Sequence, residues 1–192
     1  MRAFVAVDIP QEVRESEGLR HVLGGLKGVP GLRLVSPSAL HITLAFMGEI
    51  AENQVAATLD ALSSVKEPAF QISLRGLGGF PRNQSCRVVW LGVDEDAATL
   101  LQSLAENVRR ALDLKALPYD KKPFTAHVTV ARSKIPVDIK AAAKEVDTLQ
   151  LGRFLAKEFR LKQSVLRAEG PTYSDVAVFP LEGTGLRPGL EK

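Results

Sequence analysis

The sequence lacks the features that would mark a secreted or membrane-spanning chain. Its one cysteine, Cys86, cannot form an internal disulfide, so nothing indicates a secreted disulfide framework. No apolar run approaches the roughly 20 residues of a transmembrane helix. The opening MRAFVAVDIP reaches Asp8 and Pro10 too early to hold the apolar core of a signal peptide. We therefore expect a cytoplasmic protein that makes no membrane contact.

Charge of one sign is not strongly in excess. The formal net charge is +3 and the sequence pI is about 9.1, which favours anionic partners without diagnosing nucleic-acid binding. Hydrophobic residues make up 45% and charged residues 24% of the chain, as in ordinary folded domains. A length of 192 residues suits one domain or two closely packed lobes, and we expect a monomer.

Strand and helix patterns alternate along the chain. Helical periodicity is clearest over 97–112, where an apolar stripe lies opposite Glu106, Arg109 and Arg110, and it also occurs over about 11–24, 52–65 and 138–149. Seven β-branched-rich runs indicate strands: AFVAVDI, HITLAFM, FQISLRG, CRVVWLGV, HVTVAR, FRLKQSVLR and DVAVFPL. The final EGTGLRPGLEK is rich in glycine and proline, and we expect it to be frayed.

The two halves of the chain repeat one plan. FVAVD corresponds to WLGVD, HITLA to HVTVA, and FQISL to FRLKQ. Asp8 and Asp94 are separated by 86 residues, as are His41 and His127. A parallel doubly wound sheet is disfavoured because neither half has a glycine-rich phosphate loop after its first strand. We predict a single bilobal α+β domain over 1–192, built from duplicated β-α-β-α-β units over about 1–80 and 84–181. Each lobe is a largely antiparallel sheet flanked by helices, and a groove separates the lobes.

Two of the three histidines begin the same five-residue pattern. Residues i and i+2 of a strand share a face, so His41 lies beside Thr43 and His127 beside Thr129, while Ile42, Leu44, Val128 and Val130 point to the core. Each pair could be an ordinary half-buried strand, since threonine is common in strands. A pseudo-twofold relation between the halves would instead bring both motifs to one cleft.

Paired imidazoles without a third ligand favour acid-base chemistry. A catalytic zinc site normally needs three protein ligands, and the chain has no HxH, HExxH or cysteine cluster. A serine or cysteine nucleophile is disfavoured because there is no GxSxG motif and Cys86 lies in a strand pattern. One neutral and one protonated imidazole suit in-line displacement at phosphorus, with Thr43 and Thr129 as hydrogen-bond donors to the phosphoryl oxygens. Arg132 could add a charge-assisted contact, although it could equally be a solvated residue at a strand end.

Other polar residues receive simpler interpretations. His21 lacks a threonine partner and is predicted to lie on the surface or at a helix end. The stretch YDKKPFTAHVTVARSK carries Lys121, Lys122, Arg132 and Lys134 with only Asp120 opposing them, which predicts a cationic rim or a solvated loop.

The two HxTx motifs on a duplicated scaffold resemble the 2H phosphoesterase superfamily. The stretches RAFVAVDIP, LHITLAFMGE, GLGGFPRNQSCRVVWLGV, FTAHVTVAR and LKQSVLRAEGPTY resemble its RNA 2′,3′-cyclic phosphodiesterase branch, also called 2′-5′ RNA ligase, over nearly the whole chain. The resemblance implies an active site between the lobes, no metal or other cofactor, and RNA with 2′,3′-cyclic phosphate termini as the partner.

The resemblance also implies roles for the site residues. His127 would accept a proton from water, His41 would donate a proton to the departing 3′ oxygen, and Thr43, Thr129 and Arg132 would hold the phosphate. The product would be a 2′-phosphate, and the same site could also carry out reversible 2′-5′ RNA ligation. Relatives commonly carry a tryptophan at the position of Leu34 and a proline at that of Ala126, which puts the substrate preference in question.

Two further readings remain open. A non-catalytic module that binds RNA ends would share the basic residues and leave the phosphate unchanged. A phosphodiesterase of a small cyclic nucleotide-derived phosphate would share the chemistry but not the polymer.

Overall fold

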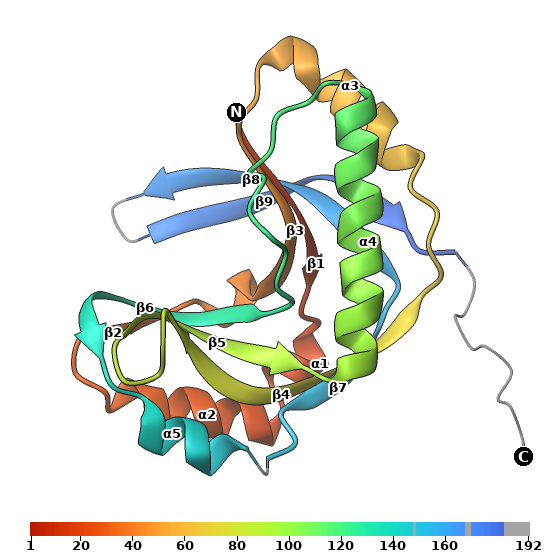
Figure 1. Cartoon of the computed structure of the whole chain (residues 1–192). Coiled ribbons are helices and arrows are strands. Elements are labelled where there is room, and N and C mark those ends of the chain that lie inside the picture. The colour runs from red at the N-terminus through yellow and green to blue at the C-terminus, as the bar shows by residue number, and fades with distance from the viewer. Residues whose placement is uncertain (148, 168–169, 183–192) are drawn as a thin grey trace, which may run out of the picture.

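The computed structural model describes residues 1–147, 149–167 and 170–182 (Figure 1). Residues 183–192, most of the predicted frayed tail, lie outside the described residues. The strands are β1 (Arg2–Asp8), β2 (Leu32–Leu34), β3 (His41–Glu49), β4 (Phe70–Phe80), β5 (Cys86–Val93), β6 (Val128–Val137), β7 (Gly152–Ala156), β8 (Glu158–Arg167) and β9 (Gly170–Pro180). The helices are α1 (Gln11–Arg14), α2 (Glu17–Lys27), α3 (Glu52–Ser63), α4 (Glu95–Leu114) and α5 (Lys140–Val146), with a 3₁₀ turn, η1 (Pro37–Ala39).

The described strands form one curled antiparallel sheet with the order β7-β4-β5-β6-β3-β1-β8-β9, and β2 pairs with β6. The sheet is almost divided in the middle, because β3 and β6 are joined through the single register pair Ile42 and Val128. On one side of this junction lies the lower lobe of Figure 1 (β7, β4, β5, β6 and β2), and on the other the upper lobe (β3, β1, β8 and β9). The predicted α+β class, with antiparallel strands flanked by helices, is confirmed.

Each lobe contains strands from both halves of the sequence. β4 follows β3 in the chain but pairs with β5 and β7 in the lower lobe, whereas β8 follows β7 but pairs with β1 in the upper lobe. The strands β4 and β8, which the sequence aligns with each other, have therefore changed places. The repeats over about 1–80 and 84–181 remain our proposal for the duplication, and the strand order means that neither repeat would form a lobe by itself.

Helices pack on the outer faces of the sheet. In Figure 1, α2 and α5 lie below the lower lobe, α4 lies on the right against β3, and α3 lies at the top right, where it packs on α4 and β9. The long helix α4 begins at Asp94, whose carboxylate accepts hydrogen bonds from the backbone N–H of Ala97 and Ser73. The stripe predicted over 97–112 is buried, except that Leu100 is 37% exposed. The fully buried stripe residues, with 0% exposure, are Leu101, Leu104, Val108 and Leu112.

The structure differs from the sequence prediction near the N-terminus. The helix expected over 11–24 is two helices, because α2 starts anew at the cap Ser16. Gly18 lies in its first turn, where a Cβ would come within 2.0 Å of the Gln150 carbonyl oxygen, so this close approach requires glycine. The short strands β2 and β7 were not predicted, since three and five residues give little periodicity. Within the described residues, no helix is long and apolar enough to cross a bilayer.

Candidate active site

The two histidine motifs meet at the junction between the lobes. Ile42 and Val128, the residues that directly follow His41 and His127, form the only register pair between β3 and β6 in the described sheet. In an antiparallel pair, this register places His41 beside Thr129 and His127 beside Thr43 on one face. The opposite face of the two strands belongs to the core. The residues that alternate with the polar ones are fully buried there, as predicted: Ile42, Leu44, Val128 and Val130. The four predicted polar residues are thus brought together from two strands far apart in sequence.

Both imidazole rings are held by the same contact. His41 Nδ1 lies 2.7 Å from the Ala39 carbonyl oxygen, and His127 Nδ1 lies 2.7 Å from the Thr125 carbonyl oxygen. A carbonyl oxygen can only accept a hydrogen bond, so Nδ1 carries the proton in each ring. The Nε2 atoms are therefore the nitrogens that can gain or lose a proton, and neither has a hydrogen-bond partner in the described part of the chain.

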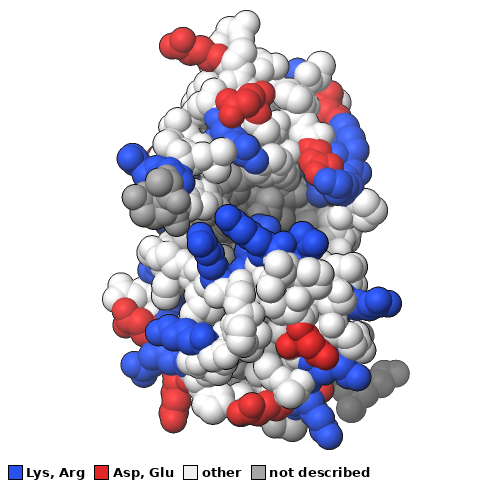
Figure 2. All heavy atoms as spheres, turned by 90° about the vertical axis from the view of Figure 1, so that its left-hand side faces the viewer, with Lys and Arg blue, Asp and Glu red and all other residues white. Residues whose placement is uncertain are grey.

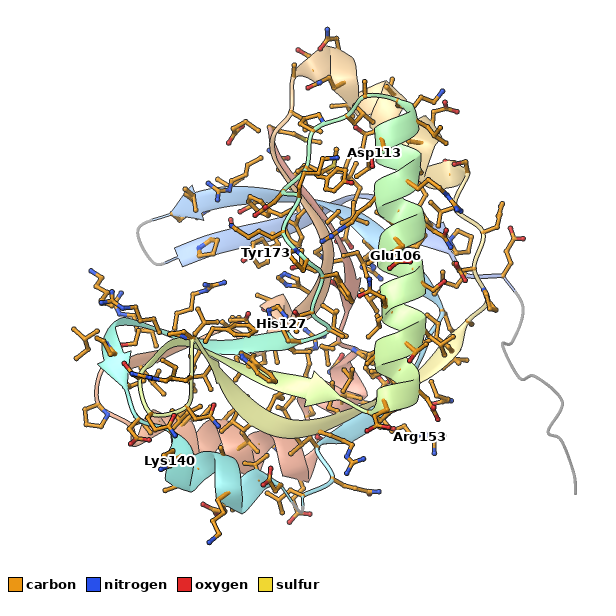
Figure 3. All side chains as sticks on the ribbon, in the orientation of Figure 1. Glu106, Asp113, His127, Lys140, Arg153 and Tyr173 are labelled. Carbon is orange, nitrogen blue, oxygen red and sulfur yellow. The ribbon has the colours of Figure 1, made fainter. Side chains whose placement is uncertain are left out.

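Aromatic side chains enclose each histidine. His41 packs against Phe4 and Tyr173, with ring centroids 4.8 Å and 5.3 Å away. His127 packs against Phe80 at 5.3 Å and Trp90 at 6.3 Å. Figure 3 shows His127 between the two lobes, with Tyr173 of β9 above it and α4 to its right. These contacts limit the rotation of the imidazoles and exclude water from one side of each ring.

Burial is the main influence on the protonation of the site. It lowers the pKa of His41 and of His127 below the ordinary value of 6.5, and the positive charge of Arg132 lowers both further. The carboxylate of Asp8, the register partner of His41 on β1, acts in the opposite direction on His41 and is partly offset by Lys162. His127 has no corresponding carboxylate among its influences, because Asp94 caps α4 instead.

A bulge in β6 brings Arg132 to the histidine face. Strict alternation from Thr129 would direct residue 131 to the groove and residue 132 to the core. The register with β5 shifts between Val89 and Trp90, so that Trp90 pairs with Thr129 and Val88 pairs with Arg132. The exposed Arg132 therefore shares the face of Thr129, and its influence on both rings places it near both histidines.

The threonine hydroxyls are available for a ligand. Thr43 and Thr129 are half-buried, and neither hydroxyl makes a hydrogen bond to another residue that the structure describes. They lie on the same face as the two Nε2 atoms and Arg132. The face thus offers two proton-transfer groups, two hydroxyl donors and one cation, which is the set needed to bind and transform a phosphoryl group.

The cationic rim predicted around the second motif is wrong in part. Lys121 forms an ion pair with Asp113 on α4, and Lys122 forms one with Asp120, so both charges are balanced locally. Spacing along the sequence shows Asp120 but not Asp113, which reaches the loop only because α4 packs beside it. Arg132 keeps its free charge, since it makes no ion pair within the described residues.

The loop before His127 is fastened to the strand of His41 by Arg109. Its Nε donates to the Leu44 carbonyl oxygen at 3.2 Å and its Nη1 donates to the Lys122 carbonyl oxygen at 3.0 Å. The guanidinium also lies over the rings of Tyr119 and Phe124. The sequence places Arg109 on the polar face of α4, but here it connects the two histidine segments.

The remaining candidates lie away from this face. His21 is exposed on α2, where its Nε2 lies within hydrogen-bonding distance of Glu145 Oε1 at 3.1 Å, in keeping with the predicted surface position. Cys86 is fully buried, and burial raises the pKa of its thiol, which does not favour a thiolate nucleophile. Among residues 1–147, 149–167 and 170–182, no group of three or more His, Cys, Asp and Glu is placed to hold a metal ion.

The aromatic surroundings of the histidines and the charge network of the upper lobe were not predicted from the sequence. Phe4 and Trp90 stand 86 residues apart, like the histidines, and this shared spacing was the signal that could have found them. The network is carried by β1, β8 and β9, where Lys162, which is 9% exposed, binds Asp8 at 2.7 Å and Asp175 at 2.6 Å. Arg160 pairs with the same two carboxylates. No local sequence pattern relates residue 8 to residue 162, so this network could be found only from the tertiary structure.

Comparison with known proteins adds an independent finding. The family model of the 2′-5′ RNA ligase superfamily matches residues 11–165. A protein of Archaeoglobus fulgidus named RNA 2′,3′-cyclic phosphodiesterase is 40% identical over 93% of this chain and 99% of its own length. A protein of the same name from Methanothermobacter thermautotrophicus is 32% identical over 94% and 99% of the two chains. The crystal structure of TT0787 of Thermus thermophilus superposes with a TM-score of 0.77 at 29% identity, covering 95% and 99%. Apo LigT of E. coli gives a TM-score of 0.71 at 26% identity, covering 94% and 96%.

Proposed function

The chain belongs to the 2′-5′ RNA ligase superfamily, and we propose that it is a metal-independent RNA 2′,3′-cyclic phosphodiesterase that works by two-histidine acid-base catalysis. The observation that carries this proposal is the pair of imidazoles on one face, each with Nδ1 bound to a carbonyl and Nε2 free. The names of the similar proteins support the substrate class.

The proposed reaction is an in-line hydrolysis. Nε2 of His127 takes a proton from water, and the water oxygen forms a bond to the phosphorus of the terminal 2′,3′-cyclic phosphate. The bond between phosphorus and the 3′ oxygen breaks, and this oxygen receives the proton of His41 Nε2. The product is a 2′-phosphomonoester next to a free 3′ hydroxyl. Transfer of the proton from His127 to His41 through solvent restores the starting state.

Three residues hold the phosphate in this scheme. The hydroxyls of Thr43 and Thr129 donate hydrogen bonds to the non-bridging oxygens, and Arg132 balances their negative charge. Donors fixed in advance by the sheet need not reorganise when negative charge builds up in the transition state. If the 5′ hydroxyl of a second RNA took the place of water, the same steps would form a bond from its oxygen to phosphorus and release the 3′ oxygen, and the product would be a 2′-5′ phosphodiester, as in 2′-5′ ligation.

The surroundings of the histidines support the assignment of the acid. The carboxylate of Asp8 beside His41 favours the protonated ring, whereas the equivalent Asp94 is used to cap α4 and gives His127 no such support. On this basis the proposal assigns the proton donor to His41 and the acceptor to His127. The proposal also includes a monomer in a reducing cytoplasm, which the lone buried cysteine supports.

The test follows an oligonucleotide ending in a 2′,3′-cyclic phosphate by phosphorus NMR. The wild-type protein should convert the cyclic signal to that of a 2′-phosphomonoester, and His41→Ala or His127→Ala should each slow this by at least about 10²-fold. His21→Ala is the matched control, because this exposed histidine lies on α2 and pairs only with Glu145. Full activity in either groove variant would refute the mechanism. RNA binding without any change in the phosphate would favour the binding module, and turnover of mononucleotides alone would favour the small-molecule enzyme.

A further inference from the structure

A row of directly paired residues crosses the groove face of the lower lobe. Phe80 on β4 pairs with Val88 on β5, Val88 pairs with Arg132 on β6, and Arg132 pairs with Arg33 on β2. Register partners in adjacent antiparallel strands share a face. Since Arg132 shares the face of Thr129 and Phe80 packs against His127, the whole row faces the groove. We call these four residues the groove row.

The Arg33 and Arg132 pair is unusual. Like charges directly opposite each other in a sheet repel and reduce stability. Both side chains are exposed, and neither forms an ion pair with any residue in the described ranges. Adjacent strands are about 4.8 Å apart, so the two guanidinium groups start from neighbouring positions. Two arginines that repel each other and have no carboxylate partner among the described residues are expected where a bound anion compensates their positive charge.

Basic side chains continue along the same end of the lower lobe. Arg87 on β5 donates from Nη1 to the Lys134 carbonyl oxygen at 2.8 Å, which fixes its position against β6, and Lys134 itself is exposed. Figure 2 looks into the groove and shows a cluster of Lys and Arg side chains directly below the central hollow. The anionic ligand that reaches Arg132 therefore has a basic surface to follow beyond the reacting phosphate.

On the upper lobe, two basic residues of β8 are already paired with carboxylates. There, Lys162 and Arg160 are both bound by Asp8 and Asp175, and Arg160 also binds Glu158. These contacts neutralise the two cations within the protein. A polyanion entering the groove thus meets these two cations already balanced, whereas Arg33 and Arg132 on the lower lobe make no ion pair within the described residues.

We propose that the RNA strand upstream of the reacting terminus lies along the lower lobe, with Arg33 binding the phosphate next to the one held by Arg132. This inference rests on the proposed function and deepens it, because it makes the substrate an oligonucleotide and not a mononucleotide. The exposed aromatic Phe80 at the other end of the groove row suits a nucleic acid better than another polyanion, since a base can stack on its ring. Arg33 is thus a specificity residue that does not touch the reacting atoms.

The experiment compares two substrates in Arg33→Gln. One is a cyclic 2′,3′-mononucleotide and the other a short oligonucleotide with the same terminus. The ratio of kcat/KM for the oligonucleotide to that for the mononucleotide should fall about tenfold in the variant, because only the oligonucleotide has the second phosphate. The slope of the logarithm of oligonucleotide affinity against that of salt concentration should fall by about 0.7, the value for one contact to a single strand.

Arg153→Gln is the matched control. It removes one exposed cation from β7, at the far edge of the lower lobe near the base of α4 (Figure 3), and should leave both the ratio and the slope unchanged. The melting temperature of Arg33→Gln should be equal to or above that of the wild-type protein, since a repulsion is removed. An unchanged ratio in Arg33→Gln, or an equal loss for both substrates, would overturn the proposal.

A binding measurement keeps this inference separate from the proposed reaction. Fluorescence anisotropy of a labelled oligonucleotide carrying a 2′-phosphate needs no turnover, and Arg33→Gln should weaken it about tenfold while Arg153→Gln should not. If the wild-type protein hydrolysed neither substrate, the proposed reaction would fail while this binding test still decided the path of the RNA. Equal binding by the wild-type protein and Arg33→Gln would refute the path.

Discussion

The contact between Gly78 and Trp90 offers a sensitive test of how the lower lobe holds His127. Gly78 on β4 is the register partner of Trp90 on β5, and the indole lies directly over the glycine. A Cβ at position 78 would lie 2.3 Å from Trp90 Cζ2 and 2.4 Å from Cη2, whereas ordinary contacts begin at 3.4 Å. In Gly78→Ala the indole must therefore move by about 1 Å or more, because the backbone of a central strand cannot easily retreat.

That displacement reaches the active site. Trp90 packs 5.2 Å from Phe80 and 6.3 Å from His127, and Phe80 packs 5.3 Å from the same imidazole. A misplacement of about 1 Å in a catalytic group can reduce the rate about 100-fold. We therefore expect kcat for a cyclic mononucleotide to fall about 100-fold in Gly78→Ala. The free energy of unfolding should fall by about 1–3 kcal/mol, as for other overpacked sites.

The assay combines kinetics with fluorescence. Trp90 is the only tryptophan of the chain, so its emission reports the indole environment directly and should change in Gly78→Ala. Gly25→Ala is the control, because a Cβ there meets nothing within 4 Å and the residue lies in α2; activity should be unchanged and stability should rise by about 0.5–1 kcal/mol. Trp90→Leu in the Gly78→Ala background should recover part of the activity by freeing space. Wild-type kcat and unchanged emission in Gly78→Ala would refute the reasoning.

Other predictions concern protonation, metal, the loop clamp and the core. Burial lowers the pKa of His41 and His127 below 6.5, and one ring must be charged and the other neutral, so the optimum of kcat/KM should lie below pH 6.5; an optimum above pH 7.5 would contradict this. The pKa of both histidines is lower in the folded protein than in the unfolded chain, so the unfolded chain binds more protons as the pH drops below 6.5. The free energy of unfolding should therefore fall in that range. A chelator should leave the rate of hydrolysis unchanged. If the chelator abolished hydrolysis and added zinc restored it, the acid-base scheme would be incomplete. Arg109→Met should lower kcat roughly tenfold with little change in KM, since it removes the bonds to the Leu44 and Lys122 carbonyls; a change in KM alone would show that the loop binds substrate instead. Leu104→Ala should reduce the free energy of unfolding in urea by about 2–5 kcal/mol while the folded protein keeps its kcat, and a loss below 1 kcal/mol would mean that the site is less tightly packed than its 0% exposure indicates.

Local sequence patterns were sufficient to predict which side chains of a strand are buried and which are polar. The alternation in HITLA and HVTVA correctly separated the buried Ile42 and Val128 from the half-buried His41 and His127. The same alternation would have turned Arg132 away from the histidines, and its position in the groove depends on a bulge that no residue type announces. Helix periodicity found the buried stripe of α4 but placed Arg109 among solvated residues, because a long side chain can turn back toward a neighbouring loop.

The sequence by itself determined the α+β class and the presence of two histidine-threonine pairs with matching spacing, since period and spacing are properties of the linear order. Only the tertiary structure decided where the halves meet, because a single register pair, Ile42 with Val128, joins the two motifs across the sheet. The fold also decided which charges remain free. Lys121 and Lys122 are paired with Asp113 and Asp120, which lie close to them in the chain. Arg33 and Arg132 are far apart in the chain and become neighbours only through strand order, which local sequence does not encode.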